Sequence, residues 1–408
     1  MKVAYYTLGC KVNQYETEKI RAEFEKLGYE TAPFSEGGDI FVINTCTVTG
    51  VADGKSRAVI RKAKKINPLA KVVVTGCYSQ THIEEAESIE EADIIVDIKD
   101  KMKIPYMFGS GEKSEKQGTV TDLRVRTRAV LKVQDGCSQF CSYCLIPFAR
   151  SHKSATPIEE AVEETVRLCQ AGYKEIVLTG IRLGSYRDGE KGLAELIENL
   201  LAKTDIERIR LSSIEMWEID GRLIDLMKDG RMCNHLHIPL QNGSDRILKL
   251  MNRPYSRDEY YGLVSDLREK IPDFGLTTDI IAGFPGESEE DFEESCAFAE
   301  KIGFSRIHVF RYSRRPGTKA DLMTGHIDPE TKKKRVVYLT ELGGRLAQNF
   351  AEKHIGKECS ILFEVKKKDG FTYGYTRNYI EAKTAGFVKR NETLTLIPTN
   401  AEKGTLTV

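Results

Sequence analysis

The chain has 408 residues, of which 40% are hydrophobic and 30% are charged, a balance typical of folded globular domains. Its 61 Lys and Arg residues equal its 61 Asp and Glu residues, so the net charge is zero, which argues against a simple basic nucleic-acid coat protein. No apolar run approaches the roughly 18 residues of a membrane helix, and residues 1–6 lack the apolar core of a signal peptide. We therefore expect a cytoplasmic protein of two or three domains with no membrane partner.

The first segment alternates predicted strands with predicted helices. Strands are predicted over residues 2–8, 39–44, 71–75 and 93–96, and helices over residues 14–27 and 53–66. This alternation predicts an open parallel α/β sheet with right-handed crossovers. A stretch rich in Gly, Ser and charge over residues 108–118 indicates a linker, so the first domain is placed at residues 1–118.

Ten cysteines in a chain expected to be cytoplasmic indicate metal or redox chemistry rather than disulfides. Cys10, Cys46 and Cys77 follow the strands predicted at residues 2–8, 39–44 and 71–75. The carboxyl ends of parallel strands share one edge, where open α/β folds build ligand sites, so we expect these three thiols to converge. For any one of them a buried structural cysteine is the alternative. Four others are interpreted as structural: Cys169, Cys233, Cys296 and Cys359.

The second segment again alternates predicted strands with predicted helices, whereas the third contains short β-like runs. Strands are predicted over residues 129–134, 175–179, 208–212, 235–240, 276–282 and 306–312, with helices that include residues 156–171 and 289–302. Six βα units predict an open, partial (βα)6 barrel over residues 119–345, with its active site at the carboxyl ends of the strands. A charged helix from Pro329 to about His354 follows. Short β-like runs over residues 359–365, 371–376 and 393–397 then predict a small antiparallel β-barrel over residues 346–408.

A C-x3-C-x2-C loop, made by Cys137, Cys141 and Cys144, comes just after the first barrel strand. Three thiolates in a short loop can hold three irons of a [4Fe–4S] cluster and leave the fourth iron open to a small chelating molecule. The alternative is a zinc loop, which would need a fourth ligand such as His152.

This loop, after the first strand of a (βα)6-like segment, resembles that of the radical S-adenosylmethionine (SAM) superfamily. Further motifs resemble the methylthiotransferase family: LGCKVNQYE (8–16), NTCTVT (44–49), TGCY (75–78), QDGC (134–137), IPFAR (146–150), DIIAGFPGE (279–287) and YSRRPGT (312–318). The residues after Cys10 and around Cys46 are most similar to the MtaB type, and the C-terminal barrel looks like the TRAM RNA-binding domain. One departure is that Ser151 follows Arg150 where the family pattern leads us to expect Gly.

The resemblance implies an enzyme that replaces the C2–H of N6-threonylcarbamoyladenosine at tRNA position 37 with a methylthio group. It implies two [4Fe–4S] clusters and two SAM molecules. Cys137, Cys141 and Cys144 would hold the cluster that cleaves SAM to a 5′-deoxyadenosyl radical. Cys10, Cys46 and Cys77 would hold an auxiliary cluster that carries the extra sulfur. The implied partners are the tRNA anticodon stem-loop, SAM and a reductant such as flavodoxin or ferredoxin.

Candidate SAM contacts follow from the same resemblance and from the positions of the strand ends. The aromatic residue before the third loop cysteine lies near the adenine in this superfamily, and Tyr143 fits. The others end predicted barrel strands: Thr179, Gly180, Ser213, Glu215 and Gly283. Packing is the alternative for Tyr143, and ordinary turn chemistry is the alternative for the rest.

Candidate RNA contacts combine basic and aromatic residues. Cations beside aromatic rings suit backbone contacts and base stacking. In the C-terminal domain these are Lys366, Lys367, Lys368 and Arg377, beside Phe371, Tyr373 and Tyr375. A second basic surface includes Lys55 and Arg57, on the helix that follows Cys46, and a third includes Arg124, Arg126 and Arg128. A solvated, uninvolved face is the alternative for each.

Three other functions stay open at this point. The first is methylthiolation of isopentenyladenosine in tRNA, and the second is methylthiolation of a ribosomal protein. The residues after Cys10 argue against both. The third is a non-catalytic iron–sulfur protein that binds RNA as a sensor, which would bind RNA without cleaving SAM.

Overall fold

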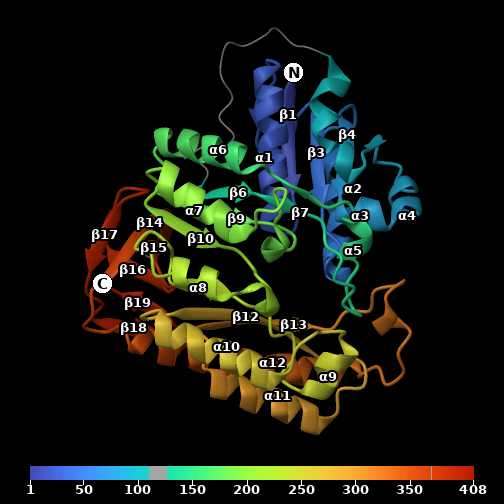
Figure 1. Ribbon diagram of the computed structural model, residues 1–408. Helices are drawn as coiled ribbons and strands as arrows, with labels where there is room; N and C mark the ends of the chain where they lie inside the picture. Colours follow the sequence, from blue (N-terminus) through green and yellow to red (C-terminus); the bar gives the residue numbers. More distant parts are fainter. Residues whose placement is uncertain (110–125, 369) are drawn as a thin grey trace. The chain divides into compact units, whose positions relative to one another are not determined.

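The computed structural model describes residues 1–109, 126–368 and 370–408 (Figure 1). Most of the predicted linker at residues 108–118 lies outside these residues, as does Arg124. The chain forms two compact units, described separately below: residues 1–122, 135–154 and 313–321, and residues 123–134, 155–312 and 322–408. The predicted domain boundaries at residues 118 and 345 stay predictions. Within the described part of the chain, no helix has the length and apolarity to cross a membrane.

The first unit contains a five-stranded, wholly parallel sheet in the order β2-β1-β3-β4-β5. Its strands are β1 (Lys2–Thr7), β2 (Glu30–Ala32), β3 (Ile40–Thr45), β4 (Lys71–Gly76) and β5 (Ile94–Ile95). Its helices are α1 (Lys11–Lys26), η1 (Phe34–Glu36), α2 (Gly50–Ile66), α3 (Cys77–Thr81), α4 (Ile83–Glu87), η2 (Ile98–Phe108), α5 (Ile146–Ala149) and η5 (Lys319–Asp321). The open parallel sheet expected from the alternating pattern is confirmed.

Both faces of this sheet are buried, which explains the unbroken apolar run of β3. Ile40 and Val42 pack on one face with Ile20 and Phe24 of α1. Phe41 and Ile43 point to the other face, among side chains of α2. A parallel strand covered on both faces needs apolar residues at every position rather than at alternate ones.

The second unit contains six parallel strands that follow chain order. They are β6 (Ala129–Lys132), β9 (Glu175–Thr179), β10 (Arg208–Leu211), β11 (His235–His237), β12 (Gly275–Ala282) and β13 (Arg306–Arg311). One ladder joins β6, β9 and β10, a second joins β11, β12 and β13, and isolated bridges such as Ile209 to Met232 connect them. Among the described residues no ladder joins β13 back to β6, in agreement with the partial barrel predicted from the sequence.

Helices connect these strands, as a right-handed parallel arrangement requires, and α12 then leads from β13 to the C-terminal sheet. They are α6 (Ile158–Gln170), η3 (Leu183–Ser185), α7 (Leu193–Lys203), η4 (Met216–Glu218), α8 (Gly221–Leu226), α9 (Asp245–Leu250), α10 (Arg257–Lys270), α11 (Glu289–Ile302) and α12 (Pro329–Glu352). Short strands β7 (Gln134–Asp135) and β8 (Ser154–Ala155) flank the segment that carries the C-x3-C-x2-C loop.

The C-terminal part of the second unit is a small six-stranded sheet in the order β17-β14-β15-β16-β19-β18. Its strands are β14 (Cys359–Lys368), β15 (Phe371–Thr376), β16 (Glu381–Ala385), β17 (Thr393–Leu396), β18 (Asn400–Glu402) and β19 (Thr405–Thr407). Its pairs are antiparallel except for β16 with β19, which is parallel. No ladder closes β17 against β18 among the described residues, so the predicted barrel stays a prediction.

Candidate active site

Three cysteines lie at the carboxyl ends of neighbouring strands in the first unit. Cys10 follows β1, Cys46 follows β3 and Cys77 follows β4, and these strands are adjacent in the sheet. Cys10 is exposed, whereas Cys46 and Cys77 are buried. Burial, together with the nearby thiols of Cys77 and Cys10, raises the pKa of Cys46 to about 11. The pKa of Cys77 is raised by burial and by Cys10. The fold therefore brings the three thiols within electrostatic range of one another.

Asn13 and Thr45 tie the three cysteine-bearing loops together. The Asn13 Nδ2 atom donates to the Leu8 carbonyl at 2.8 Å and to the Thr45 carbonyl at 2.9 Å. The Thr45 hydroxyl donates to the Thr75 carbonyl at 2.6 Å. Leu8 lies just before the Cys10 loop, and Thr75 lies at the end of the strand that leads to Cys77. These bonds therefore fix the spacing of all three cysteines, and the cysteine pattern gave no sign of them.

Two glycines keep this edge of the sheet open. Gly9 has φ +96°, and a Cβ placed on it would lie 2.9 Å from the Cys46 sulfur. Gly76 has φ +106°, and a Cβ there would lie 2.5 Å from the Thr45 backbone nitrogen. Left-handed φ values favour glycine, and a larger residue would collide with Cys46 at position 9 and with the Thr45 backbone at position 76. Gly9 thus leaves room next to the Cys46 thiol, and Gly76 allows the β3 and β4 strand ends to lie close together.

The C-x3-C-x2-C loop also belongs to the first unit, in residues 135–154. The backbone amide of Gln139 donates to the Cys137 sulfur at 3.3 Å, and that of Ile146 donates to the Cys144 sulfur at 3.4 Å. Hydrogen bonds to the sulfurs are among the features by which proteins set the properties of iron–sulfur clusters. Tyr143, the aromatic residue predicted to lie near the SAM adenine, is half-buried in this loop.

The chemistry of these six sulfur donors fits iron–sulfur clusters. None of the ten cysteines forms a disulfide. In the described part of the chain, no three His, Cys, Asp or Glu side chains surround a single metal-ion position. A cluster distributes its thiolates over different irons, so their sulfurs need not meet at one point, whereas a zinc site with His152 would require that. The role of the six cysteines as cluster ligands stays a prediction.

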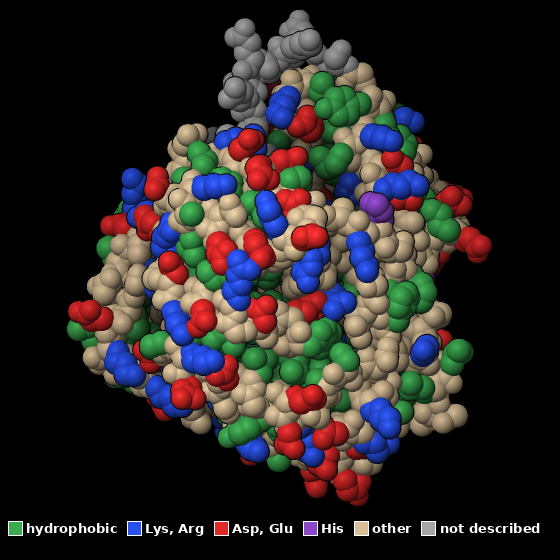
Figure 2. All heavy atoms as spheres, viewed as in Figure 1, with side chains coloured by type: hydrophobic (Ala, Val, Ile, Leu, Met, Phe, Trp, Pro, Cys, Tyr) green, Lys and Arg blue, Asp and Glu red, His purple; other side chains and the backbone are tan. Residues whose placement is uncertain are grey.

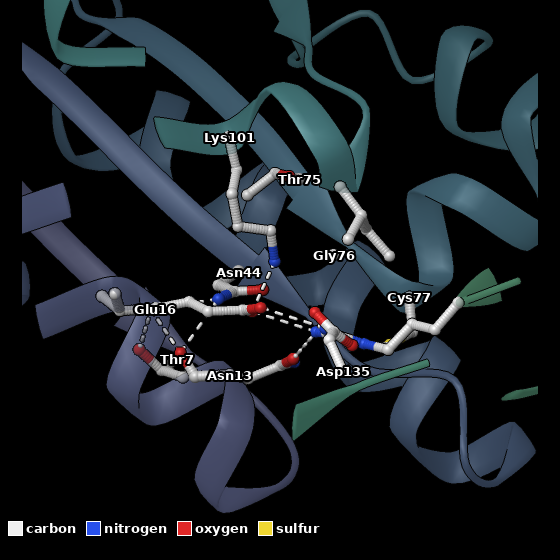
Figure 3. A network of polar contacts seen from close by, with 12 residues as sticks. Thr7, Asn13, Glu16, Asn44, Thr75, Gly76, Cys77, Lys101 and Asp135 are labelled. Carbon is white, nitrogen blue, oxygen red and sulfur yellow. Dashed lines mark hydrogen bonds and ion pairs between the residues drawn. The ribbon is translucent and has the colours of Figure 1, made fainter. Parts of the chain in front are cut away.

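A buried ionic network lies beside Cys77 and was not anticipated from the sequence (Figure 3). Glu16 of α1 accepts from Lys101 of η2 at 2.5 Å, and both side chains are almost fully buried. The Arg150 guanidinium pairs with Glu16 and with Asp135. Glu16 is polar, and the spacing of apolar residues along the helix does not show that its side chain faces the interior. The network is therefore visible only in the folded structure.

The remaining candidate SAM residues lie at strand ends of the second unit. Thr179 is buried at the end of β9, and a Cβ on Gly180 would lie 2.7 Å from Gln134 Oε1. Ser213 is exposed after β10. Gly283 follows β12 with φ +76°, and its amide donates to Glu287 at 2.7 Å. Each occupies the carboxyl edge predicted for it, and contact with SAM stays a prediction.

Glu215, also a candidate SAM contact, is held by an arginine. Its carboxylate accepts from Arg253 Nη1 at 3.1 Å, and the Arg253 guanidinium lies 4.9 Å from the centroid of the Trp217 ring. Trp217 therefore has a structural role. It packs the arginine that orients Glu215.

The candidate RNA residues differ in how accessible they are. Lys55 is exposed on α2, whereas Arg57 pairs with Glu85 at 2.8 Å. Arg377 Nη2 donates to the Met232 carbonyl at 2.6 Å, so its guanidinium faces the barrel strands. Lys366, Lys367 and Lys368 lie in β14, and their side chains are outside the described part. On the face drawn in Figure 2, basic and acidic side chains of the described residues are interspersed.

Arg128 corrects one expectation. It was grouped with a surface patch, but its side chain is largely buried and pairs with Glu364 at 3.1 Å. Its guanidinium also lies 4.8 Å from the centroid of the Tyr375 ring, a ring predicted to stack on RNA bases. Position in a basic run cannot distinguish an arginine that faces solvent from one that joins two sheets.

Comparisons with known proteins agree with this architecture. Residues 131–299 match the family described as Radical SAM superfamily, and residues 2–97 match the one described as Uncharacterized protein family UPF0004. The threonylcarbamoyladenosine tRNA methylthiotransferase MtaB of Bacillus subtilis (strain 168) is 39% identical over 407 residues, covering 94% of this chain and 90% of that protein. The tRNA-2-methylthio-N(6)-dimethylallyladenosine synthase of Thermodesulfovibrio yellowstonii is 31% identical, covering 95% of this chain and 93% of that protein.

A solved structure shares the fold. The radical S-adenosylmethionine methyltransferase TsrM from Kitasatospora setae superposes with a TM-score of 0.58 at 14% identity, covering 91% of this chain and 80% of that chain. The parallel partial barrel, with the matched superfamily over residues 131–299, defines a radical SAM enzyme, which uses SAM and [4Fe–4S] chemistry. With 39% identity to an MtaB enzyme over nearly its whole length, the chain belongs to the MtaB-type radical SAM methylthiotransferases.

Proposed function

We propose that this enzyme methylthiolates the adenine C2 position of N6-threonylcarbamoyladenosine at tRNA position 37, with two [4Fe–4S] clusters and two SAM molecules. The observation that carries the proposal is the presence of two separate cysteine sets in one unit. One set is the loop of Cys137, Cys141 and Cys144, and the other is Cys10, Cys46 and Cys77. A radical SAM enzyme that only cleaves SAM needs one such set, whereas sulfur insertion calls for a second.

The two cysteine sets would divide the chemistry between them. When bound, the two clusters would supply one-electron cleavage of SAM and a sulfur for transfer. The protein itself would position the six sulfurs as two separate sets of three. Asn13 and Thr45 fix the loops of the first set, and backbone amides donate to the sulfurs of the second.

The substrate would be held through basic residues on α2. Lys55 lies on this helix, whose N-terminal turn begins just after the Cys46 loop. Lysines beside a reactive centre suit the phosphates that flank a target base. Arg377 and the β14 lysines would contribute from the C-terminal sheet, although the guanidinium of Arg377 is held by Met232.

The test is a matched pair of synthetic anticodon stem-loops that differ only in the group on N6 of adenosine 37, threonylcarbamoyl in one and isopentenyl in the other. The enzyme is reconstituted anaerobically and given SAM and dithionite, and products are read by nucleoside mass spectrometry. Methylthiolation of the threonylcarbamoyl stem-loop alone is the expected result. RNA binding without any 5′-deoxyadenosine would instead indicate a non-catalytic sensor.

A second candidate substrate is the isopentenyl (dimethylallyl) form of the same nucleoside. It is favoured by the 31% identity to the Thermodesulfovibrio yellowstonii synthase over almost the whole chain. The isopentenyl form is the second candidate because the identity to the Bacillus subtilis MtaB enzyme is higher, at 39%. The same stem-loop pair separates the two candidates, because the isopentenyl stem-loop would then be the one that reacts.

A further inference from the structure

The structure assigns Arg150 as a positioning residue that links the two cysteine sets and holds the Cys77 sulfur for its cluster. This inference rests on the proposed function, in which Cys77 is an auxiliary-cluster ligand. Arg150 follows α5, directly after the C-x3-C-x2-C loop. Its side chain is fully buried, with 0% exposure.

The guanidinium uses all five of its N–H donors. The Nε atom donates to the Cys77 sulfur at 3.4 Å. The Nη1 atom donates to Glu16 at 3.0 Å and to Asp135 at 2.9 Å, and Nη2 donates to Glu16 at 2.9 Å and to Asn13 at 2.8 Å. A planar fork with five donors matches this set of acceptors, and an ammonium group with three does not.

The backbone of the same residue reaches the other cysteine set. The amide of Cys137 donates to the Arg150 carbonyl at 3.1 Å. One residue therefore bonds to Cys137 through its main chain and to Cys77 through its side chain. Because Asn13 also bonds to the loops of Cys10 and Cys46, the guanidinium is anchored to the whole first set.

The acceptors around Arg150 explain why a cation sits here. Glu16 and Asp135 balance the charges of Arg150 and Lys101, and all of these side chains except Asp135 are almost fully buried. A thiolate at Cys77 adds one negative charge directly at the Nε donor. A cationic donor to a cluster sulfur favours the more negative, reduced state of that cluster and so raises its reduction potential.

The test isolates the auxiliary cluster spectroscopically. In the full chain, Cys137, Cys141 and Cys144 are changed to Ala, so that only the Cys10, Cys46 and Cys77 set can bind iron. Arg150→Gln and Arg150→Lys are then made in this background, reconstituted anaerobically, and followed by iron analysis and by redox titration with electron paramagnetic resonance. The matched control is Arg21→Gln, which removes another arginine charge of this unit, one that pairs with Glu18 on α1.

We expect Arg150→Gln to move the potential of the bound cluster to more negative values. The expected shift corresponds to a tenfold change in the ratio of oxidised to reduced cluster, about 59 mV for a one-electron couple. Arg150→Lys keeps the charge and should shift the potential less, and Arg21→Gln should leave the potential unchanged. A purely structural role would lower the iron content without moving the potential of the iron that remains.

Two outcomes would overturn the assignment. One is an iron-loaded Arg150→Gln protein with an unchanged potential, and the other is equal loss of iron from the Arg150→Gln and Arg21→Gln variants. A different result tests the proposed function itself. If the parent with an intact Arg150 binds no iron through Cys10, Cys46 and Cys77, then the auxiliary cluster is absent, and the failure lies with that assignment.

Discussion

Single residues decide whether the cysteine edge of the first unit can form. The positions of Cys10, Cys46 and Cys77 at strand ends were predictable, because each follows an apolar run whose pattern predicts a strand. Asn13, Glu16 and Arg150 were not, since a sequence pattern marks a polar side chain without showing whether it is buried among partners. Their buried positions appear only when α1 and the loop after residue 135 pack against the sheet. Buried polar groups of this kind need full hydrogen-bond satisfaction, so they specify one arrangement.

Replacing Gly76 by Ala tests the shape of this edge. Gly76→Ala forces a Cβ to within 2.5 Å of the Thr45 backbone at a left-handed φ, so we expect a loss of about 2 kcal/mol or more. Differential scanning calorimetry measures the change in the unfolding midpoint. Gly344→Ala is the control, because Gly344 lies within α12 with no atom near its Cβ position and should gain about 0.5–1 kcal/mol. Equal effects at the two glycines would refute this account of the edge.

Whole elements were the most predictable level of this structure. The strands expected at residues 175–179 and 371–376 match β9 and β15, and the helix expected at residues 289–302 matches α11. These elements were predicted correctly because each has a dense apolar pattern and is bounded by residues that end a strand or a helix. Short elements such as β2 and β18 carry too few residues for a period to show, and the 3-10 run of η2 contains Pro105, which breaks a helical pattern. The parallel pair of β16 and β19 depends on connections that no local pattern encodes.

Cys46→Ala tests the assignment of strand ends β1, β3 and β4 to a cluster. Reconstituted parent enzyme should hold about eight irons from two four-iron clusters, and the variant about four. Methylthiolation should be lost, while SAM cleavage to 5′-deoxyadenosine continues, because the loop cysteines are untouched. Cys169→Ala in α6 is the matched control and should keep all the iron. A Cys46→Ala protein with its full iron content would remove Cys46 from the ligand set.

At the scale of the molecule, each unit is stabilised by charges buried where its parts join. In the second unit, Glu175 at the start of β9 accepts from Arg210 at 2.7 Å. The same arginine donates to the Arg377 carbonyl at 3.0 Å, and Arg208 donates to the Ser360 hydroxyl at 2.9 Å. These bonds attach the C-terminal sheet to the barrel strands. The C-terminal sheet itself was predictable from its short β-like runs, whereas these bonds to the barrel strands were not.

Acid should loosen this attachment. Burial alone raises the pKa of Glu175, but Arg210, Arg128 and Arg208 outweigh it, so the pKa is lowered overall. Because the folded pKa lies below the unfolded value of about 4.3, the stabilisation is complete above that pH and is lost as the pH falls through and below it. Glu175→Gln should therefore cost about 3–5 kcal/mol at pH 7, and its difference from the parent should narrow as the pH falls below the unfolded pKa of about 4.3.

Thermal unfolding midpoints between pH 3 and pH 8 measure this effect. The control is Glu207→Gln, whose side chain is half-exposed beside Lys174 and should change stability by less than about 1 kcal/mol at any pH. An acid-induced loss in Glu175→Gln as steep as in the parent would show that another carboxylate is responsible.

The proposed function depends on which nucleoside this enzyme modifies. The most direct measurement is nucleoside mass spectrometry of total tRNA from cells with and without the gene. Without the gene, we expect 2-methylthio-N6-threonylcarbamoyladenosine to disappear and N6-threonylcarbamoyladenosine to accumulate in its place. A tRNA profile in which the methylthiolated nucleoside persists, or in which the isopentenyl derivative disappears instead, would contradict the proposed function.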